Sequence, residues 1–421
     1  MLKSKYLLAL SFLLIPNITF AQVVYVDEVD TYEFVRPLYI YSEKNVNDKT
    51  NYTRIREDGA ESESWEEAYA NFKKSLTDNY GLSYSIDGSI LGQRGAPNGK
   101  GTAIQFQLYP TISWQAYNGE YGTGTLNVAY NPVRYWNSTS GEDLSNNINV
   151  ISSVNDSTTK SNTFSDLNFT HQFSGSLNWL AITVGQFGIS AFDGTSYDSN
   201  QQVNFLNYAL SQNASSSYPS ASLGAYLTFT LNPEWQIIAG MQDAHNINGT
   251  SISSSDFGKG KYTSFASLSF TPTIKDLGSG EYSILVFNQP SVEEQRGTSN
   301  GFSINVEQML NDTYGLFGRV SATYNSPEEI NQTYVIGGVM NNPLNRNQLD
   351  QIGLATSINK VNKEVVGDDT RDYETVLEAY WAWGIGNWLT ITPDLQFYIH
   401  PALDKNEDTA TVASIRTTFM F

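Results

Sequence analysis

Residues 387–399 read NWLTITPDLQFYI, and apolar and polar side chains alternate along this stretch. One set of alternate positions is mainly apolar and consists of Leu389, Ile391, Leu395, Phe397 and Ile399. The positions between them carry Trp388, Thr390, Thr392, Asp394, Gln396 and Tyr398. Because successive side chains of a β-strand point to opposite faces, a period of two predicts a strand with one apolar face and one wet face.

The same alternation recurs along most of the chain after residue 80, for example in residues 221–231, ASLGAYLTFTL. Segments of this kind begin near residues 81, 102, 123, 164, 177, 221, 234, 261, 281, 299, 313, 332, 349, 373, 387 and 409. We therefore predict an all-β fold, a transmembrane antiparallel β-barrel of about 16 strands, because an even number of strands suits a closed barrel.

The predicted connections alternate between short turns and long polar loops. The short turns include residues 232–234, 311–312 and 386–387, and the long loops are 137–160, 192–220 and 361–372. Short turns on one rim and long loops on the other are typical of outer-membrane barrels. A soluble sandwich with its apolar faces turned inward would show the same strand pattern.

Two further features favour a lipid-facing barrel over a soluble sandwich. The apolar faces often end in Tyr, Trp or Phe, as the aromatic girdles of membrane barrels do. In the last segment, Ala413, Ile415, Phe419 and Phe421 share one face. The terminal Phe421 resembles the C-terminal aromatic signal of barrels that the outer-membrane assembly machinery receives, so we expect that machinery and outer-membrane lipid as partners.

The first residues predict export. Lys3 and Lys5 precede an apolar run, 6–15, and small residues stand before Gln22. This pattern predicts a signal peptide over residues 1–21 that is cleaved after Ala21. The run is shorter than the roughly 20 residues that a membrane-spanning helix needs. No comparable apolar stretch follows, which leaves a secreted protein or a barrel in the outer membrane of a Gram-negative cell.

Residues 22–80 are predicted to form an acidic N-terminal extension that contains one short amphipathic helix before the barrel, 81–421. Ser64 and Glu67 have the spacing of a capping box. Trp65, Ala68, Phe72 and Leu76 recur at helical spacing, so the helix should run to about Asn79 and stop before Gly81. We expect its Trp65, Phe72 and Leu76 stripe to pack on the main domain; the alternative is a plug or gate for the pore.

Composition argues against several function classes. The chain has 43 acidic and 24 basic residues, a net charge of -19, which repels nucleic acid. It has no cysteine, so no disulfide can form. His171, His245 and His400 are far apart and lack metal-ligand spacing, and no nucleophile elbow, P-loop or dinucleotide fingerprint is present. We therefore predict no catalytic residues, no metal and no cofactor, and a protein that is not an enzyme.

Several blocks resemble the carbohydrate-selective porins of the OprB type, in the same order and over most of residues 65–421. They are Trp65 with Leu76 and the 80–82 junction, LAITVGQ at 180–186, GLFGR at 315–319, YETVLEAY at 373–380, LTITPDLQ at 389–396 and His400-Pro401. This resemblance implies a 16-stranded barrel that lets small sugars diffuse across the outer membrane.

The chain departs from that family in one block and in its charge. RNQLDQIG at 346–353 has one residue more than the family's corresponding step. The pore of the family is often basic, whereas this chain has ten arginines and is strongly acidic. The preference among neutral, acidic and basic solutes therefore stays open.

The alternation also predicts which side chains line the lumen. If Leu377, Ala379, Trp381 and Trp383 face lipid, with the tryptophans in an aromatic girdle, the residues between them face inward. The pore-lining candidates on such wet faces are Glu374, Glu378, Tyr380, Asp394, Gln396, Arg319 and Arg416. Arginines opposed to carboxylates would create a transverse field and a constriction. Alternatively, Glu378, Asp394 and Arg416 form a network within the wall.

These observations predict a passive outer-membrane porin for sugars. A general, weakly cation-preferring porin is the first alternative, because acidic loops and an acidic lumen would concentrate cations. A secreted all-β binding or adhesion protein is the second. The sequence leaves the oligomeric state open.

Overall fold

The computed structural model describes residues 64–96, 101–275 and 277–421, and describes side chains from residue 66 onward. The predicted signal peptide, 1–21, and the extension up to residue 63 lie outside the described residues, as do the side chains of Ser64 and Trp65. Within the described part, no helix is long and apolar enough to span a membrane.

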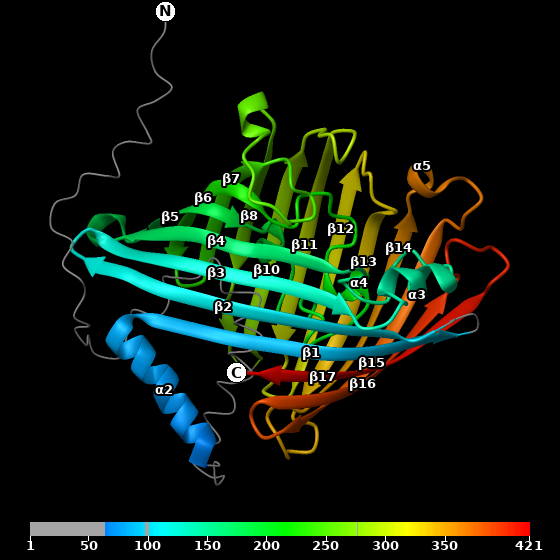
Figure 1. Ribbon diagram of the computed structural model, residues 1–421, viewed down its shortest axis with the longest axis horizontal. Helices are drawn as coiled ribbons and strands as arrows, with labels where there is room; N and C mark the ends of the chain where they lie inside the picture. Colours follow the sequence, from blue (N-terminus) through cyan, green and yellow to red (C-terminus); the bar gives the residue numbers. More distant parts are fainter. Residues whose placement is uncertain (1–63, 97–100, 276) are drawn as a thin grey trace, which may run out of the picture.

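The described chain forms seventeen strands in one antiparallel sheet, and sixteen of them are long (Figure 1). The first eight are β1 (Leu82–Ala96), β2 (Ala103–Gly119), β3 (Gly122–Tyr135), β4 (Ser161–Phe173), β5 (Leu180–Phe187), β6 (Ser222–Asn232), β7 (Trp235–Asp243) and β8 (Tyr262–Phe270). The two-residue strand β9 (Thr273–Ile274) lies beside the start of the next long strand. The other eight are β10 (Gly278–Gln289), β11 (Ser299–Met309), β12 (Tyr314–Tyr324), β13 (Ile330–Asn341), β14 (Gln351–Val361), β15 (Tyr373–Ile385), β16 (Leu389–Ile399) and β17 (Thr409–Met420).

The sheet closes on itself. Each long strand pairs with its neighbours in sequence, β8 pairs with β10, and β1 pairs with both β2 and β17. In the closing pair, Leu91 lies opposite Arg416 and Ala96 opposite Thr411. Closure leaves no long strand with an unpaired edge, which is what a sheet in lipid requires. The predicted barrel of about 16 strands is confirmed, and each predicted strand start lies within about three residues of the observed one.

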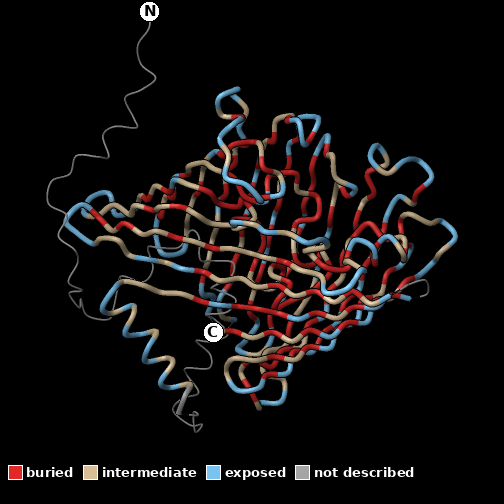
Figure 2. Tube along the Cα trace, viewed as in Figure 1, coloured by how far each residue is buried: buried red, intermediate tan, exposed pale blue. Residues whose placement is uncertain are grey.

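The alternation of the sequence becomes an alternation of faces in the wall. Along β15, Leu377, Trp381 and Trp383 are exposed on the outer face, while Glu378 and Tyr380 are buried on the inner face. The tube view shows the same interleaving of buried and exposed positions along the strands (Figure 2).

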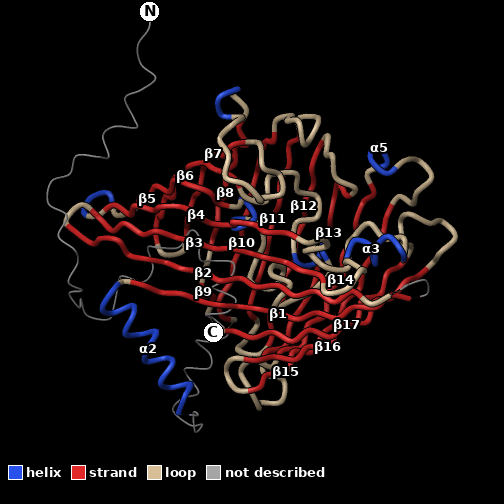
Figure 3. The backbone as a smooth tube through the Cα atoms, viewed as in Figure 1, coloured by secondary structure: helices blue, strands red, loops and turns tan. Residues whose placement is uncertain are grey.

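Long and short connections alternate over most of the chain, as predicted, but the connection 325–329 between β12 and β13 is shorter than 342–350 between β13 and β14. On one rim, β2–β3, β6–β7 and β15–β16 are joined by the short turns 120–121, 233–234 and 386–388. On the other rim, long segments join β3 to β4 (136–160), β5 to β6 (188–221) and β7 to β8 (244–261). Figure 3 shows these connections as loops between the strands, with short helices in the long ones. Those helices are α3 (Gly141–Asn147), η2 (Ile189–Phe192), α4 (Tyr208–Ser211) and η3 (Phe257–Lys259); η1 (Gly175–Leu177) lies in the turn after β4 and α5 (Lys363–Val366) in the loop before β15.

The predicted N-terminal helix is present as α2 (Ser64–Tyr80), which lies at the rim beside the C-terminus (Figure 1). It ends at Tyr80, and the next residue, Gly81, caps it with a positive φ of 64° and an N–H that donates to the Thr77 carbonyl at 2.9 Å.

The prediction that Phe72 packs on the barrel is wrong, because its side chain is 53% exposed, whereas Leu76 of the same stripe is half-buried. Instead, the Tyr69 ring contacts Tyr84 and Phe421 with centroid distances of 6.5 and 6.3 Å, and the Lys73 ammonium lies 5.2 Å from the Tyr84 ring centre. Only Gly81 separates α2 from β1, so the chain direction at this junction decides which helix face meets the rim. A plug or gate role for α2 stays a prediction.

Candidate functional site: the barrel interior

Residues 188–221, named here the long inner loop, lie inside the barrel. Phe192 packs in a cluster with Leu285 of β10, and the Phe205 ring lies 4.9 Å from Tyr380 of β15. The Gln201 side chain donates to Gln107 of β2 at 2.6 Å. These strands lie on different sides of the ring, so the loop crosses the interior.

Residues 136–160, named here the α3 loop, fold in beside it. Ser140 caps α3 by accepting a bond from the Asp143 N–H, and the Asp143 carboxylate accepts from the Ser140 N–H at 2.8 Å. Burial of Leu144 and Ile148 against Val376 of β15 attaches the helix to the inner wall. Polar backbone of the irregular segment that follows therefore lies against the inner wall and needs partners there.

Asn207 joins the two inner loops. Its side chain, which is fully buried, caps α4 by accepting from the Ala209 N–H and donates to the carbonyls of Ser152 and Ser153 in the α3 loop. The same amide donates to the Tyr398 hydroxyl on β16 at 2.9 Å. One side chain thus connects both loops and the wall.

The predicted pore-lining carboxylates of β15 bind backbone of the inner loops. Glu374 accepts bonds from the N–H groups of Ile151 and Ser152 at 3.1 and 2.8 Å, and from Ala402 at 3.0 Å. Glu378 accepts from the N–H groups of Leu206 and Asn207. Both glutamates have 0% exposure.

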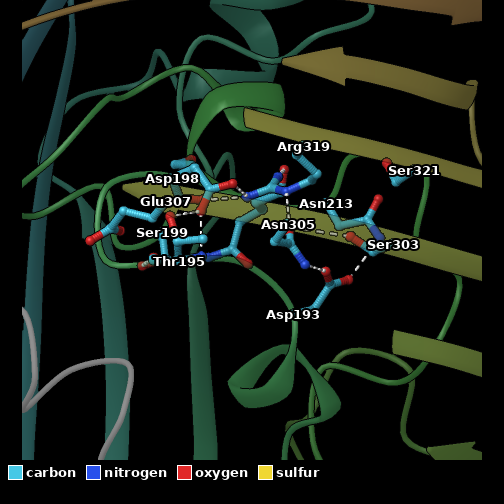
Figure 4. A network of polar contacts seen from close by, with 12 residues as sticks. Asp193, Thr195, Asp198, Ser199, Asn213, Ser303, Asn305, Glu307, Arg319 and Ser321 are labelled. Atoms are coloured by element: carbon cyan, nitrogen blue, oxygen red, sulfur yellow. Dashed lines mark hydrogen bonds and ion pairs between the residues drawn. The ribbon is translucent and has the colours of Figure 1, made fainter. Parts of the chain in front are cut away.

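Arg319 on β12 lies in a buried polar network with the long inner loop (Figure 4). Its guanidinium lies 2.7 Å from the Asp198 carboxylate and donates to the Gln212 carbonyl and to the Asn305 side chain. Asn305 in turn donates to Asp193, which also accepts from the Tyr218 hydroxyl. The arginine therefore binds the loop at two separate points, Asp198 and Gln212.

The other candidates have similar surroundings. Arg416 on β17 donates to the carbonyls of Gln201 and Asn204. Gln396 donates to the Val154 carbonyl at 2.9 Å, and the Tyr380 hydroxyl donates to Gln351 at 2.6 Å. Asp394, which is 6% exposed, lies close enough to Glu378 and Arg416 for their charges to interact.

All seven predicted residues face the interior, and the structure brings Glu378, Asp394 and Arg416 together. The inner loops cover most of them, so their contact with a permeating solute stays a prediction. The residues that sequence analysis missed are those of the loops, above all Asp198 and Asn207. A usable signal is present in the sequence: Phe192, Phe205 and Leu206 are apolar side chains within or beside the predicted long polar loop, 192–220.

One acidic group lies where the two loops meet. Asp156 of the α3 loop accepts from the Ser157 hydroxyl at 2.9 Å, and its own N–H donates to the Gln201 side chain at 3.0 Å. Burial raises the pKa of Asp156 from its usual range to about 6. Among the residues that the structure describes, no group of three or more His, Cys, Asp or Glu could hold a metal ion.

Comparison with known proteins agrees with this architecture. A family model described as "Carbohydrate-selective porin, OprB family" matches residues 245–421. Porin AaxA of Chlamydia felis is 39% identical over 345 residues, which cover 80% of this chain and 77% of that protein. Porin AaxA of Chlamydia pneumoniae is 36% identical over 368 residues, 84% of this chain and 83% of that protein.

Solved structures show the same fold at lower identity. The structure of Pseudomonas putida OprB at high pH has a TM-score of 0.69 and 15% identity, and the match covers 84% of this chain and 97% of that one. Salmonella typhi OmpF has a TM-score of 0.53 and 11% identity, with 81% of this chain and 97% of that one covered. The chain belongs to the carbohydrate-selective porin OprB family and is an outer-membrane porin, a channel and not an enzyme.

Proposed function

We propose that this porin passes small neutral sugars by passive diffusion into the periplasm. The observation that supports this most directly is the chemistry of the inner wall, which carries mainly amides and hydroxyls, among them Asn168, Thr170 and Thr183, which bond neighbouring groups of the wall. Such groups can replace water on sugar hydroxyls while the solute moves. The family description points to the same solutes.

The burial of the inner arginines also favours neutral solutes over anions, because a buried cation does not attract a passing anion. Arg319 is paired with Asp198, and Arg416 is bonded to loop carbonyls. Both guanidinium groups are buried, with 1% exposure of each arginine, so neither presents an accessible cation to an anionic sugar. The remaining hydrogen-bonding groups of the wall suit uncharged hydroxyl-rich molecules.

Swelling of liposomes that contain the refolded protein tests this proposal. We expect mono- and disaccharides to enter faster than uncharged polyols of similar size that lack a pyranose ring. Equal rates for both classes at each size would show a sieve without sugar preference and would refute the proposed selectivity.

A weakly cation-preferring general porin is the second candidate, and the inner charge balance favours it. Glu281, Glu307 and Asp394 are buried on the inner face in addition to the glutamates of β15. A net negative interior concentrates cations. The reversal potential in a KCl gradient separates the candidates, since a value near zero argues against cation preference.

We also propose a cleaved signal peptide, an N-terminal extension and a role for Phe421 in assembly. A signal peptide over 1–21 would be removed after Ala21, which N-terminal sequencing of the exported protein tests. Residues 22–80 would form an extension to the barrel, 81–421. Phe421 would serve the outer-membrane assembly machinery, and its replacement should lower the amount of folded barrel in the membrane.

A further inference from the structure

The inner face of β15 contacts both inner loops in sequence order. Glu374 binds the backbone of the α3 loop, and Val376 packs against the apolar residues of that loop. Glu378 binds the backbone of the long inner loop, and Tyr380 contacts Phe205 of the same loop. Four alternate positions of one strand thus form a docking strip for the two segments that occupy the lumen.

Each glutamate binds its loop with a pair of adjacent N–H groups. Ile151 and Ser152 form one pair, and Leu206 and Asn207 form the other. Two oxygens of a carboxylate match two neighbouring donors, and charge makes these bonds stronger than bonds between neutral groups. An amide of the same shape has only one acceptor oxygen, so it would turn an N–H donor toward one of the two loop N–H groups.

We propose that Glu374 and Glu378 are positioning residues for permeation: each holds one inner loop against β15, and together they fix the size of the conducting path. Conduction itself does not require either glutamate to touch the solute. The proposal depends on the protein being a porin and is independent of whether sugars are preferred.

Single-channel recording in KCl without sugar tests the proposal with Glu374→Gln, Glu378→Gln and the control Asp166→Asn. Asp166 is a carboxylate of β4 that accepts a hydrogen bond from Asn168 of the same strand, so the control removes an acidic group of the wall and keeps both glutamate–loop attachments. We expect both glutamate variants to change conductance by a larger factor than the control and to add switching between current levels. Equal conductance and steady current in all three variants would overturn the proposal.

Replacing Glu378 by the shorter acid aspartate separates the effect of the carboxylate's position from the effect of its charge. Glu378→Asp keeps the carboxylate but withdraws it from the Leu206 and Asn207 N–H groups. We expect it to behave like Glu378→Gln, and wild-type behaviour would show that charge alone matters. Since the wild-type chain has no cysteine, Ala209→Cys, at a fully buried position of α4, gives a second readout.

Thiol labelling of Ala209→Cys should be slow with Glu378 present, faster with Glu378→Gln or Glu378→Asp, and unchanged with Asp166→Asn. Folding of every variant is checked by heat-modifiable mobility on a gel. If Glu378→Gln fails to fold, Glu378→Asp decides the question. Slow labelling in every folded variant would contradict release of the loop.

Discussion

Arg319 and Asp198 form an ion pair with no exposed side-chain surface on either residue. Removing two charges from water is costly, and hydrogen bonds to the remaining atoms must offset that cost. Here the Asn305 side chain and the Gln212 carbonyl supply such bonds to the arginine. The pair connects the wall to the long inner loop, so loss of one partner should first weaken the attachment of that loop to β12.

Arg319→Met should destabilise the folded barrel by about 3 to 5 kcal/mol, because it leaves the Asp198 carboxylate buried without a counter-charge. Urea unfolding followed by heat-modifiable mobility measures the change. Arg296→Met is the matched control, because Arg296 is exposed in the loop between β10 and β11. A loss of stability in Arg319→Met no larger than in the control would show that the pair is dispensable.

The free energy of unfolding should depend on pH partly through the ionisation of Asp156. Burial raises its pKa in the folded state to about 6, above its value in the unfolded chain. Its stabilising contribution is therefore complete below about pH 4 and is lost as the pH rises through 6, by at most about 3 kcal/mol. Melting temperatures between pH 4 and 8 should fall less steeply in Asp156→Asn than in wild type. The exposed Asp312→Asn should keep the wild-type slope, and an unchanged slope in Asp156→Asn would refute the assignment.

At the scale of elements, the strands could be predicted because their signal is local. Leu389 to Ile399 alternates in the sequence itself, and the wall needs only that period and paired neighbours. The inward face of Glu374 or Arg319 follows from the same period. Their partners do not, because those partners are backbone groups of loops that are distant in sequence. The bond between Gln201 and Gln107, for example, depends on the path of the whole loop.

Helix α2 shows a different limit of the sequence pattern. Periodicity predicted the helix, but the face that meets the rim depends on where Tyr84 and Phe421 lie after the barrel has closed. From apolar spacing alone, Phe72 is therefore predicted to contact the rim, whereas Tyr69 makes that contact in the structure.

Tyr69→Ala should loosen α2 from the rim, because it removes two aromatic contacts that contribute about 0.5 to 1.5 kcal/mol each. Limited proteolysis of the refolded protein should then cleave within α2 faster than in wild type. Phe72→Ala is the control, since that ring is largely exposed. Equal cleavage rates in Tyr69→Ala and wild type would contradict the observed packing.

In the whole molecule, the strands close into a barrel and the two inner loops fill part of its interior. The ring of strands closes without the loops, through β1 and β17, and provides a polar inner surface. The long inner loop and the α3 loop then occupy part of that interior, and Asn207 connects them to each other and to β16. The channel therefore depends on a rigid wall and on two segments attached to it by charged side chains.

Whether this barrel conducts and prefers sugars is decided by single-channel conductance of the refolded protein in a planar bilayer, with and without mono- and disaccharides. We expect discrete current steps that sugars reduce at millimolar concentrations, because a solute bound among the inner amides and hydroxyls displaces ions. Steps that sugars leave unchanged would contradict the carbohydrate preference. The absence of any steps would contradict the channel itself.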